Sequence, residues 1–338
     1  MTKRKKILLI IAVTALALGA FWYYTSLNMV ITKANAEIEL QLRQEISEIK
    51  NELFEGIKNR DYDKVSKLIS PKLLEVKDFD LKSFVNQAST LLDKRDFLIA
   101  DQYLSTLKKI GKESKATIVP SLTDKSKFII NNLTFFGKES YNLFLKSTNP
   151  GWQHLSFISL SKFKGKWKIN IIHFGDYSIN NLTAPKLYNL GIEAKNKNRL
   201  SSCVVYSWGI NKFLRPAPYL QYIDEQKYLK FVKSSVSEMN ATFKFPFIID
   251  GITIFGFQIE TTDNEGLIPI ILYITDKDLN NPVLDEEAKQ LKDEILKKFY
   301  GLDNDFDYIV MRAYNEMPSD PNKKYNYRGT VIKLKADK

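Results

Sequence analysis

The sequence is poor in the residues that carry most enzyme chemistry. It has one cysteine, Cys203, and two histidines, His154 and His173, in 338 residues. A single cysteine excludes an intramolecular disulfide, and two histidines exclude a three-histidine zinc site. The metal spacings His-x-x-x-His and Cys-x-x-Cys are absent, as are the phosphate loop and the motifs Gly-x-Ser-x-Gly and Gly-x-Gly-x-x-Gly. The sequence therefore predicts no cofactor.

Cys203 lies in the apolar run Cys203-Val204-Val205-Tyr206. A cysteine in such a run is typical of a small buried hydrophobic residue rather than a nucleophile. Its position far from the N-terminus also excludes a lipidated cysteine. We expect a buried, inert thiol.

The net charge of +11 is unevenly distributed. Lys3, Arg4, Lys5 and Lys6 supply four of these charges, a modest excess follows up to residue 180, and the remainder is close to neutral. This distribution lacks the clustering of a nucleic-acid binder, so no nucleic-acid partner is predicted. The excess up to residue 180 favours a solvated surface, with an anionic membrane surface or a cell-wall polymer as partner in the alternative interpretation.

Residues 7–24 form an uncharged and largely apolar run, ILLIIAVTALALGAFWYY. At about 1.5 Å per residue this run gives about 27 Å of helix, enough to cross a bilayer core. The interface residues are the basic stub 1–6 (Lys3, Arg4, Lys5 and Lys6) and the aromatic cluster Phe21, Trp22, Tyr23 and Tyr24. The pattern predicts a single-pass membrane protein with a cytoplasmic N-terminus and extracytoplasmic domains.

Cleavage of a signal peptide is the alternative for this segment. Ala34-Asn35-Ala36 has the small-x-small form of a cleavage site, and cutting near Ala36 would release a secreted protein. The site lies about a dozen residues beyond the apolar run, which is also longer than the 7–15 residues of a signal sequence. These two lengths favour an anchor.

Residues 36–180 are predicted to form an α+β domain, with helices followed by antiparallel strands. An apolar stripe predicts an amphipathic helix over 36–59, Asp61 is a predicted N-cap, and a further helix is expected over about 81–95. The strands are predicted over 97–110, 116–122, 128–136, 141–146, 155–163 and 167–177. The clearest hairpin turns at Lys164-Gly165.

Residues about 48–180 resemble the NTF2-like (cystatin-like) fold. The resemblance lies in Leu53-Phe54, in Asn59-Arg60-Asp61-Tyr62-Asp63-Lys64-Val65, and in the closing Gly165-Lys166-Trp167-Lys168-Ile169. It implies helices packed on a curved sheet. The family hosts enzymes, pocket binders and assembly modules, so the resemblance implies a fold more than a function.

The second half of the chain resembles no family that we recognise. Residues 181–246 are predicted to form a helical hairpin plus one helix. Residues 247–338 are predicted to form a ββαββ domain, whose helix over 282–300 ends at Gly301.

Two groups of residues are candidates for chemistry. If the NTF2-like sheet holds a pocket site, His173, as general base, and Asp176 are the first residues to consider. An ordinary hydrogen-bonded strand histidine is the favoured interpretation of His173. Asp303, Asp305 and Asp307 imitate the start of a calcium loop, but Tyr308 and Tyr314 replace its glycine and its closing glutamate. Solvated loop charges are the favoured interpretation there, so no metal site is predicted.

The sequence leaves two functions open. The first is a membrane-anchored, extracytoplasmic, non-catalytic module that binds envelope proteins or cell-wall polymer. The second is an enzyme or small-ligand receptor that uses the NTF2-like cavity. An open cavity would favour the second function, and a cavity filled by side chains would favour the first.

Overall fold

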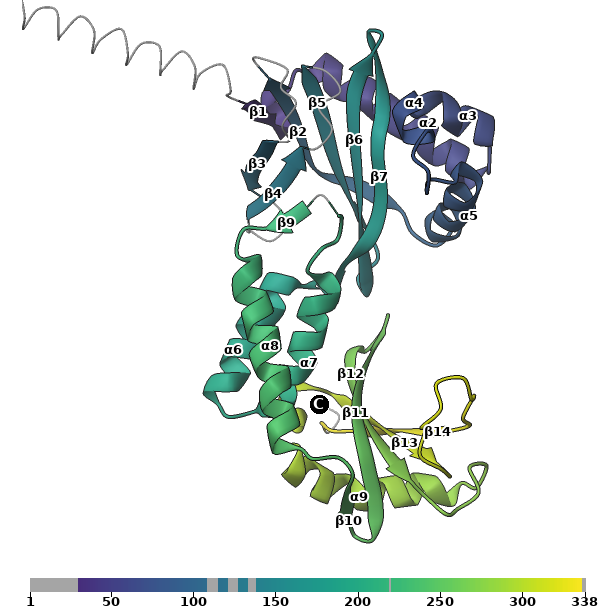
Figure 1. The fold of residues 1–338 in the computed structure, drawn as a ribbon, viewed down its shortest axis with the longest axis vertical. Coiled ribbons are helices and arrows are strands. Elements are labelled where there is room, and N and C mark those ends of the chain that lie inside the picture. The colour runs from purple at the N-terminus through teal and green to yellow at the C-terminus, as the bar shows by residue number, and fades with distance from the viewer. Residues whose placement is uncertain (1–29, 108–114, 121–126, 133–137, 219, 336–338) are drawn as a thin grey trace, which may run out of the picture. The chain divides into compact units, whose positions relative to one another are not determined.

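The computed structural model describes residues 30–107, 115–120, 127–132, 138–218 and 220–335. Its elements form an α+β fold (Figure 1) that divides into two compact units. The first unit comprises residues up to 148, 155–174 and 217–221, and the second comprises residues 149–154, 175–216 and 222–338. The chain passes between the units several times, so neither unit is one continuous stretch of sequence.

Most of a curled antiparallel sheet lies in the first unit, whereas β8 and parts of β6 and β7 belong to the second. The strand order is β1–β2–β5–β6–β7–β8. The bounds are Val30–Ala34, Phe97–Leu107, Glu139–Ser147, Trp152–Phe163, Lys166–Ile179 and Leu182–Thr183. Lys164 and Gly165 connect β6 to β7 with φ values of 49° and 82°. Two positive φ angles are what a two-residue hairpin turn requires, so the predicted turn is confirmed.

Four helices cover one face of this sheet (Figure 1). They are α2 (Leu40–Lys58), α3 (Tyr62–Leu68), α4 (Pro71–Leu74) and α5 (Leu81–Leu92), after the short η1 (Asn35–Glu37). The Asp61 side chain accepts a hydrogen bond of 2.9 Å from the Lys64 amide, which confirms the predicted N-cap of α3.

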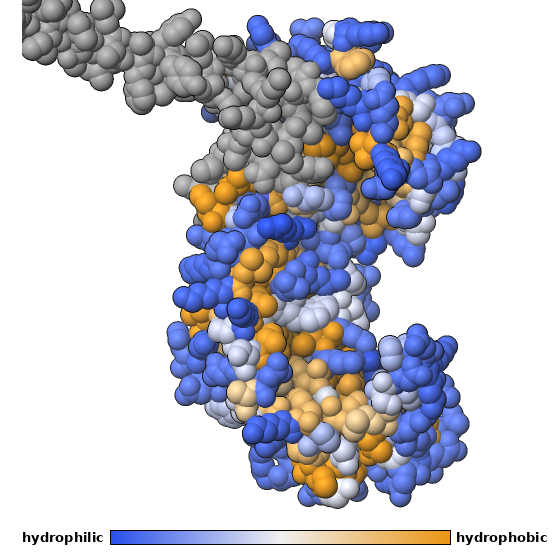
Figure 2. Space-filling view, viewed as in Figure 1, coloured by the Kyte–Doolittle hydropathy of each residue, from blue (hydrophilic) through white to orange (hydrophobic). Residues whose placement is uncertain are grey.

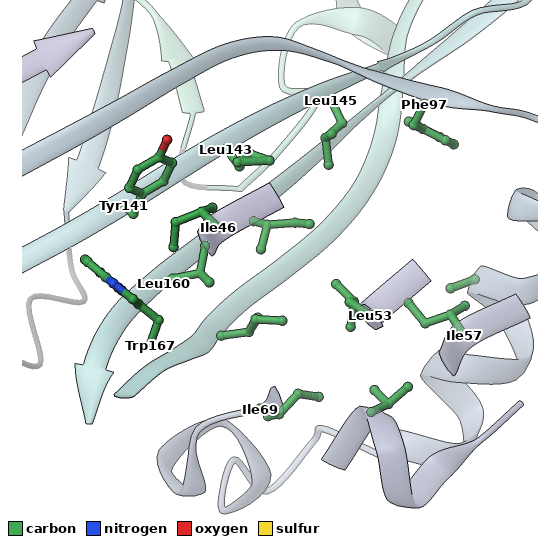
Figure 3. Close-up of a cluster of buried hydrophobic side chains, with 14 of the residues drawn as sticks. Ile46, Leu53, Ile57, Ile69, Phe97, Tyr141, Leu143, Leu145, Leu160 and Trp167 are labelled. Carbon is green, nitrogen blue, oxygen red and sulfur yellow. The ribbon is translucent and has the colours of Figure 1, made fainter. Parts of the chain in front are cut away.

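The core of the first unit lies between α2 and the sheet (Figure 3). Ile46, Leu53 and Ile57 come from α2 at the 3.6-residue period of a helix and are 0–1% exposed. They meet alternate residues of the strands, such as Leu143 and Leu160, because side chains of a strand alternate between its two faces.

A small second sheet has the strand order β3–β4–β9. Its strands are β3 (Lys115–Pro120), β4 (Lys127–Asn132) and β9 (Leu220–Tyr222). β9 lies about ninety residues after β4 in the sequence, and no periodic pattern in its three residues predicted a strand.

The second unit contains three helices that pack together: α6 (Ala184–Asn196), α7 (Leu200–Phe213) and α8 (Glu225–Thr242). Gly191 of α6 faces Phe231 of α8. A methyl group at Gly191 would lie 2.6 Å from the ring atom Cζ of Phe231. The glycine therefore permits close approach of the two helices.

A five-stranded sheet completes the second unit, in the order β10–β11–β12–β13–β14. Its strands span Phe247–Ile249, Ile252–Thr262, Gly266–Ile274, Tyr308–Tyr314 and Arg328–Lys333. Between β12 and β13 the chain forms α9 (Val283–Lys298) and α10 (Leu302–Asp305). β12 and β13 are parallel. The intervening helix carries the chain back to the end of the sheet at which β12 begins, so β13 runs in the same direction.

The membrane prediction needs correction. Among the helices of the described ranges, none is both long enough and apolar enough to span a bilayer. The longest, α2, has 19 residues but carries charged side chains on the face that does not meet the core. The predicted fold with a transmembrane helix, and the prediction of a single-pass membrane protein, are therefore wrong for the described fold. The segment 7–24 and its predicted interface residues lie outside the described residues.

Candidate functional site

The interior between α2 and the sheet was the predicted place for a ligand cavity. The space there measures about 10 Å³ and is lined mainly by aliphatic side chains, among them Ile46, Leu53 and Ile158. A single water molecule needs about 10–15 Å³. Lys50 is the charged member of the lining, and burial lowers the pKa of its ammonium group. A lysine with a lowered pKa can act as a base, but this space has no room for a substrate.

A larger cavity of about 110 Å³ lies in the second unit. Its walls come from the end of β7, the β11–β12 turn and the α10–β13 connection, and they include Asn180, Glu265, Asp305 and Asp307. Typical small-molecule pockets measure about 300–1,000 Å³. The cavity can therefore hold a few water molecules or one side chain.

A polar and aromatic cluster is centred on Asp176 of β7, within the second unit. Trp152 and His154 project from β6, two positions apart and so on one face of the strand. Trp208 and Lys212 lie four positions apart on α7 and so on one face of that helix. We call these five residues the Asp176 cluster.

Asp176 accepts contacts on both carboxylate oxygens. Trp152 Nε1 donates a hydrogen bond of 2.9 Å to Oδ1, and His154 Nε2 lies 3.4 Å from the same oxygen. Lys212 Nζ lies 3.2 Å from Oδ2. The ammonium group also lies 4.5 Å from the ring centroid of Trp152 and 5.6 Å from that of Trp208.

The geometry of His154 argues against acid–base catalysis in this cluster. Its Nε2 faces Asp176, its Nδ1 is buried, and its ring stacks on Trp152 at an interplanar angle of 18°. A general base needs a nitrogen within hydrogen-bond reach of the substrate proton. Here the ring orients Asp176 and Trp152 instead.

The predicted pair of His173 and Asp176 is divided between the two units. His173 is a partly buried residue of β7 in the first unit, and burial lowers the pKa of its imidazole. Asp176 belongs to the second unit, where its histidine neighbour is His154. The structure therefore brings one of the two predicted residues into the cluster.

The three aspartates of the imitated calcium loop have different surroundings. Asp303 and Asp305 lie in α10, and Asp307 follows it. Asp305 pairs with Arg199 at 2.9 Å, and Asp307 pairs with Lys335 at 2.8 Å. Within the described ranges no group of three or more His, Cys, Asp or Glu side chains is arranged to hold a metal ion. The side chains of Arg199 and Lys335 therefore neutralise Asp305 and Asp307.

Cys203 is buried, as expected. Burial raises the pKa of its thiol to about 11, and its Sγ contacts the Gly191 carbonyl at 3.5 Å. The thiolate is the reactive form of cysteine. This residue is therefore a packing group at neutral pH.

The aromatic segment 243–247 is largely built into the second unit. Phe243 and Phe245 stack on Phe299, which is fully buried. Ile248 of β10 is 70% exposed, and hydrophobic side chains reach the surface at this end of the unit (Figures 1 and 2). The rings of Phe243 and Phe245 therefore pack against the core of the second unit.

Sequence reasoning missed four members of the Asp176 cluster: Trp152, His154, Trp208 and Lys212. The spacings Trp152-x-His154 and Trp208-x-x-x-Lys212 place side chains on common faces. Both spacings are frequent in ordinary sequences and do not indicate that β6 and α7 meet. Comparison with family models, with curated proteins and with solved structures finds no match to this chain.

Proposed function

We propose that this protein is a non-catalytic binding or assembly module. The observation that carries the proposal is the filled interior of the first unit, where about 10 Å³ remains between α2 and the sheet. An enzyme or receptor that used this interior would need space for its ligand. Helices on one face of a curled sheet also fit the NTF2-like resemblance, and that family includes assembly modules.

The Asp176 cluster supports the same proposal. Its carboxylate is engaged on both oxygens, and its histidine faces inward. Its two tryptophans are half-buried, which suits contact with a partner better than bond-making chemistry. Envelope proteins and cell-wall polymer stay predictions for the identity of the partner.

A ligand screen on the full chain tests the proposal. We expect no small molecule to bind in the interior of the first unit. Binding there would raise the melting temperature and would slow the hydrogen exchange of the α2 amides. Leu53→Ala is the positive control, since a large-to-small change leaves a cavity that apolar molecules such as benzene can enter. A ligand that protects α2 in the wild type would overturn the proposal. A purified partner that forms a stoichiometric complex would support it.

A further inference from the structure

The ammonium group of Lys212 occupies a site with three walls. Two walls are the indole rings of Trp152 and Trp208, at 4.5 and 5.6 Å. The third is Oδ2 of Asp176, at 3.2 Å. Aromatic rings attract cations through the negative potential of their faces, and aromatic cages are a recurrent way to bind ammonium groups. The combination of two indoles and one carboxylate selects a cation over a neutral group.

Two of the three walls, Asp176 and Trp152, do not depend on Lys212 for their positions. Trp152 Nε1 and His154 Nε2 both contact Oδ1 of Asp176, the oxygen that Lys212 does not use. His154 also stacks against the Trp152 ring. The carboxylate and the first indole are therefore held from the side opposite the ammonium, and both keep their positions when Lys212 leaves.

Lys212 is held weakly enough to be exchanged. Its side chain is 26% exposed and that of Asp176 is 31% exposed. Ion pairs and cation–π contacts that stay partly open to solvent stabilise only slightly, and ordering a lysine side chain has an entropic cost of similar size. The form with Lys212 in the site and the form with Lys212 displaced therefore differ by no more than about tenfold in population. An external cation, which must displace Lys212, binds more weakly by about that factor than it would bind an empty site.

We infer that Trp152, Trp208 and Asp176 form a recognition site for an alkylammonium group, with Lys212 as its displaceable internal occupant. The inference rests on the proposed function, because it names the chemistry of the bound partner. A lysine side chain of a partner protein and a free alkylamine offer the same group.

The experiment titrates n-butylammonium into the full chain and follows the indole N–H signals of Trp152 and Trp208 by NMR. We expect Lys212→Ala to bind it about threefold to tenfold more tightly than the wild type, because the internal competitor is gone. Asp176→Asn and Trp208→Leu, each combined with Lys212→Ala, should weaken binding at least tenfold. Neutral 1-butanol should leave both signals unchanged.

Lys227→Ala is the matched control. Lys227 also lies over an aromatic ring, at 4.8 Å from Tyr188, but outside the cluster. This variant should bind n-butylammonium as the wild type does. Equal binding by wild type and Lys212→Ala, or an equal response to 1-butanol, would overturn the inference. So would undiminished binding by folded Lys212→Ala/Asp176→Asn, with folding checked by circular dichroism.

Two further probes distinguish the sources of the cation. A lysine-containing peptide that binds more tightly than n-butylammonium supports a partner protein, and equal affinities support a free amine. Both outcomes support the site itself. If n-butylammonium fails while a purified protein still forms a stoichiometric complex, the inference is lost and the proposed function stands.

Discussion

Arg199 and Asp305 form a buried ion pair that joins the start of α7 to α10. Arg199 Nη1 lies 2.9 Å from Asp305 Oδ1, and the side chains are 8% and 12% exposed. Arg199 Nε and Asp305 Oδ2 are buried and have no hydrogen-bond partner in the described structure. The pair therefore makes one of the two bonds that a bidentate arginine–carboxylate contact provides.

Removing one charge of this pair should be costly. Asp305→Asn leaves the Arg199 guanidinium buried without a counter-ion, and we expect a loss of about 3–5 kcal/mol in the free energy of unfolding. Urea denaturation measures the change. The double variant Arg199→Leu/Asp305→Leu should recover most of the loss, since an apolar pair removes both desolvation costs. A loss below about 1 kcal/mol for Asp305→Asn would contradict the expected role of the pair.

Leu53 and Leu40, two of the leucines of α2, should respond differently to truncation. Leu53 is fully buried against the sheet, so Leu53→Ala should cost about 2–5 kcal/mol through lost burial and a new cavity. Leu40 lies on the same helix but is 61% exposed, and Leu40→Ala should change stability by less than about 0.5 kcal/mol. Denaturant titration of both variants checks the difference. Similar losses would mean that α2 does not pack as described.

Gly301 should be harder to replace than Gly165. Both have positive φ, at 96° and 82°. A methyl group at Gly301 would lie 2.5 Å from Cγ of Arg199, whereas Gly165 has nothing within 4 Å. Gly165→Ala should lower the free energy of unfolding by about 1 kcal/mol, through the backbone conformation alone. Gly301→Ala should lower it further, because the added methyl group also meets Arg199. Thermal unfolding of the two variants compares the costs, and equal values would argue against the close approach of Arg199.

Cys203 should make the protein less stable in alkali. Burial raises the pKa of its thiol from about 9 to about 11, so the folded state holds the proton to higher pH than the unfolded state does. The stabilising contribution is complete below pH 9 and is lost as pH rises toward 11. Cys203→Ala should flatten this part of the stability profile relative to the wild type. An unchanged profile would contradict the predicted burial effect.

The same thiol should react slowly with alkylating reagents. At pH 8 a pKa of about 11 lowers the thiolate fraction about a hundredfold relative to a pKa of about 9. Alkylation by iodoacetamide should therefore be slow in buffer and fast in denaturant, as mass spectrometry can follow. Rapid alkylation of the native protein would show that the site opens.

Local sequence patterns predicted the elements whose hydrogen bonds join residues that are close together in the sequence. The N-cap at Asp61 and the hairpin turn at Lys164-Gly165 both depend on residues within a few positions. The helix predicted over 282–300 ends earlier, at Lys298, and Gly301 is the N-cap of α10. The apolar stripe of α2 predicted its buried face for the same reason, because helix periodicity is a property of the segment itself. The membrane span was predicted from apolar length at 7–24, which lies outside the described residues; among the described helices none is long and apolar enough to span a bilayer.

Tertiary structure decided which distant segments meet. β1 pairs with β2 some seventy residues away, β9 joins β3 and β4, and β12 lies parallel to β13. The Asp176 cluster follows the same rule, because its members come from β6, β7 and α7. The sequence by itself determined the separate helices, strands and turns. Only long-range packing placed Lys212 between two tryptophans and beside Asp176, because no local period encodes a contact between segments thirty-six residues apart.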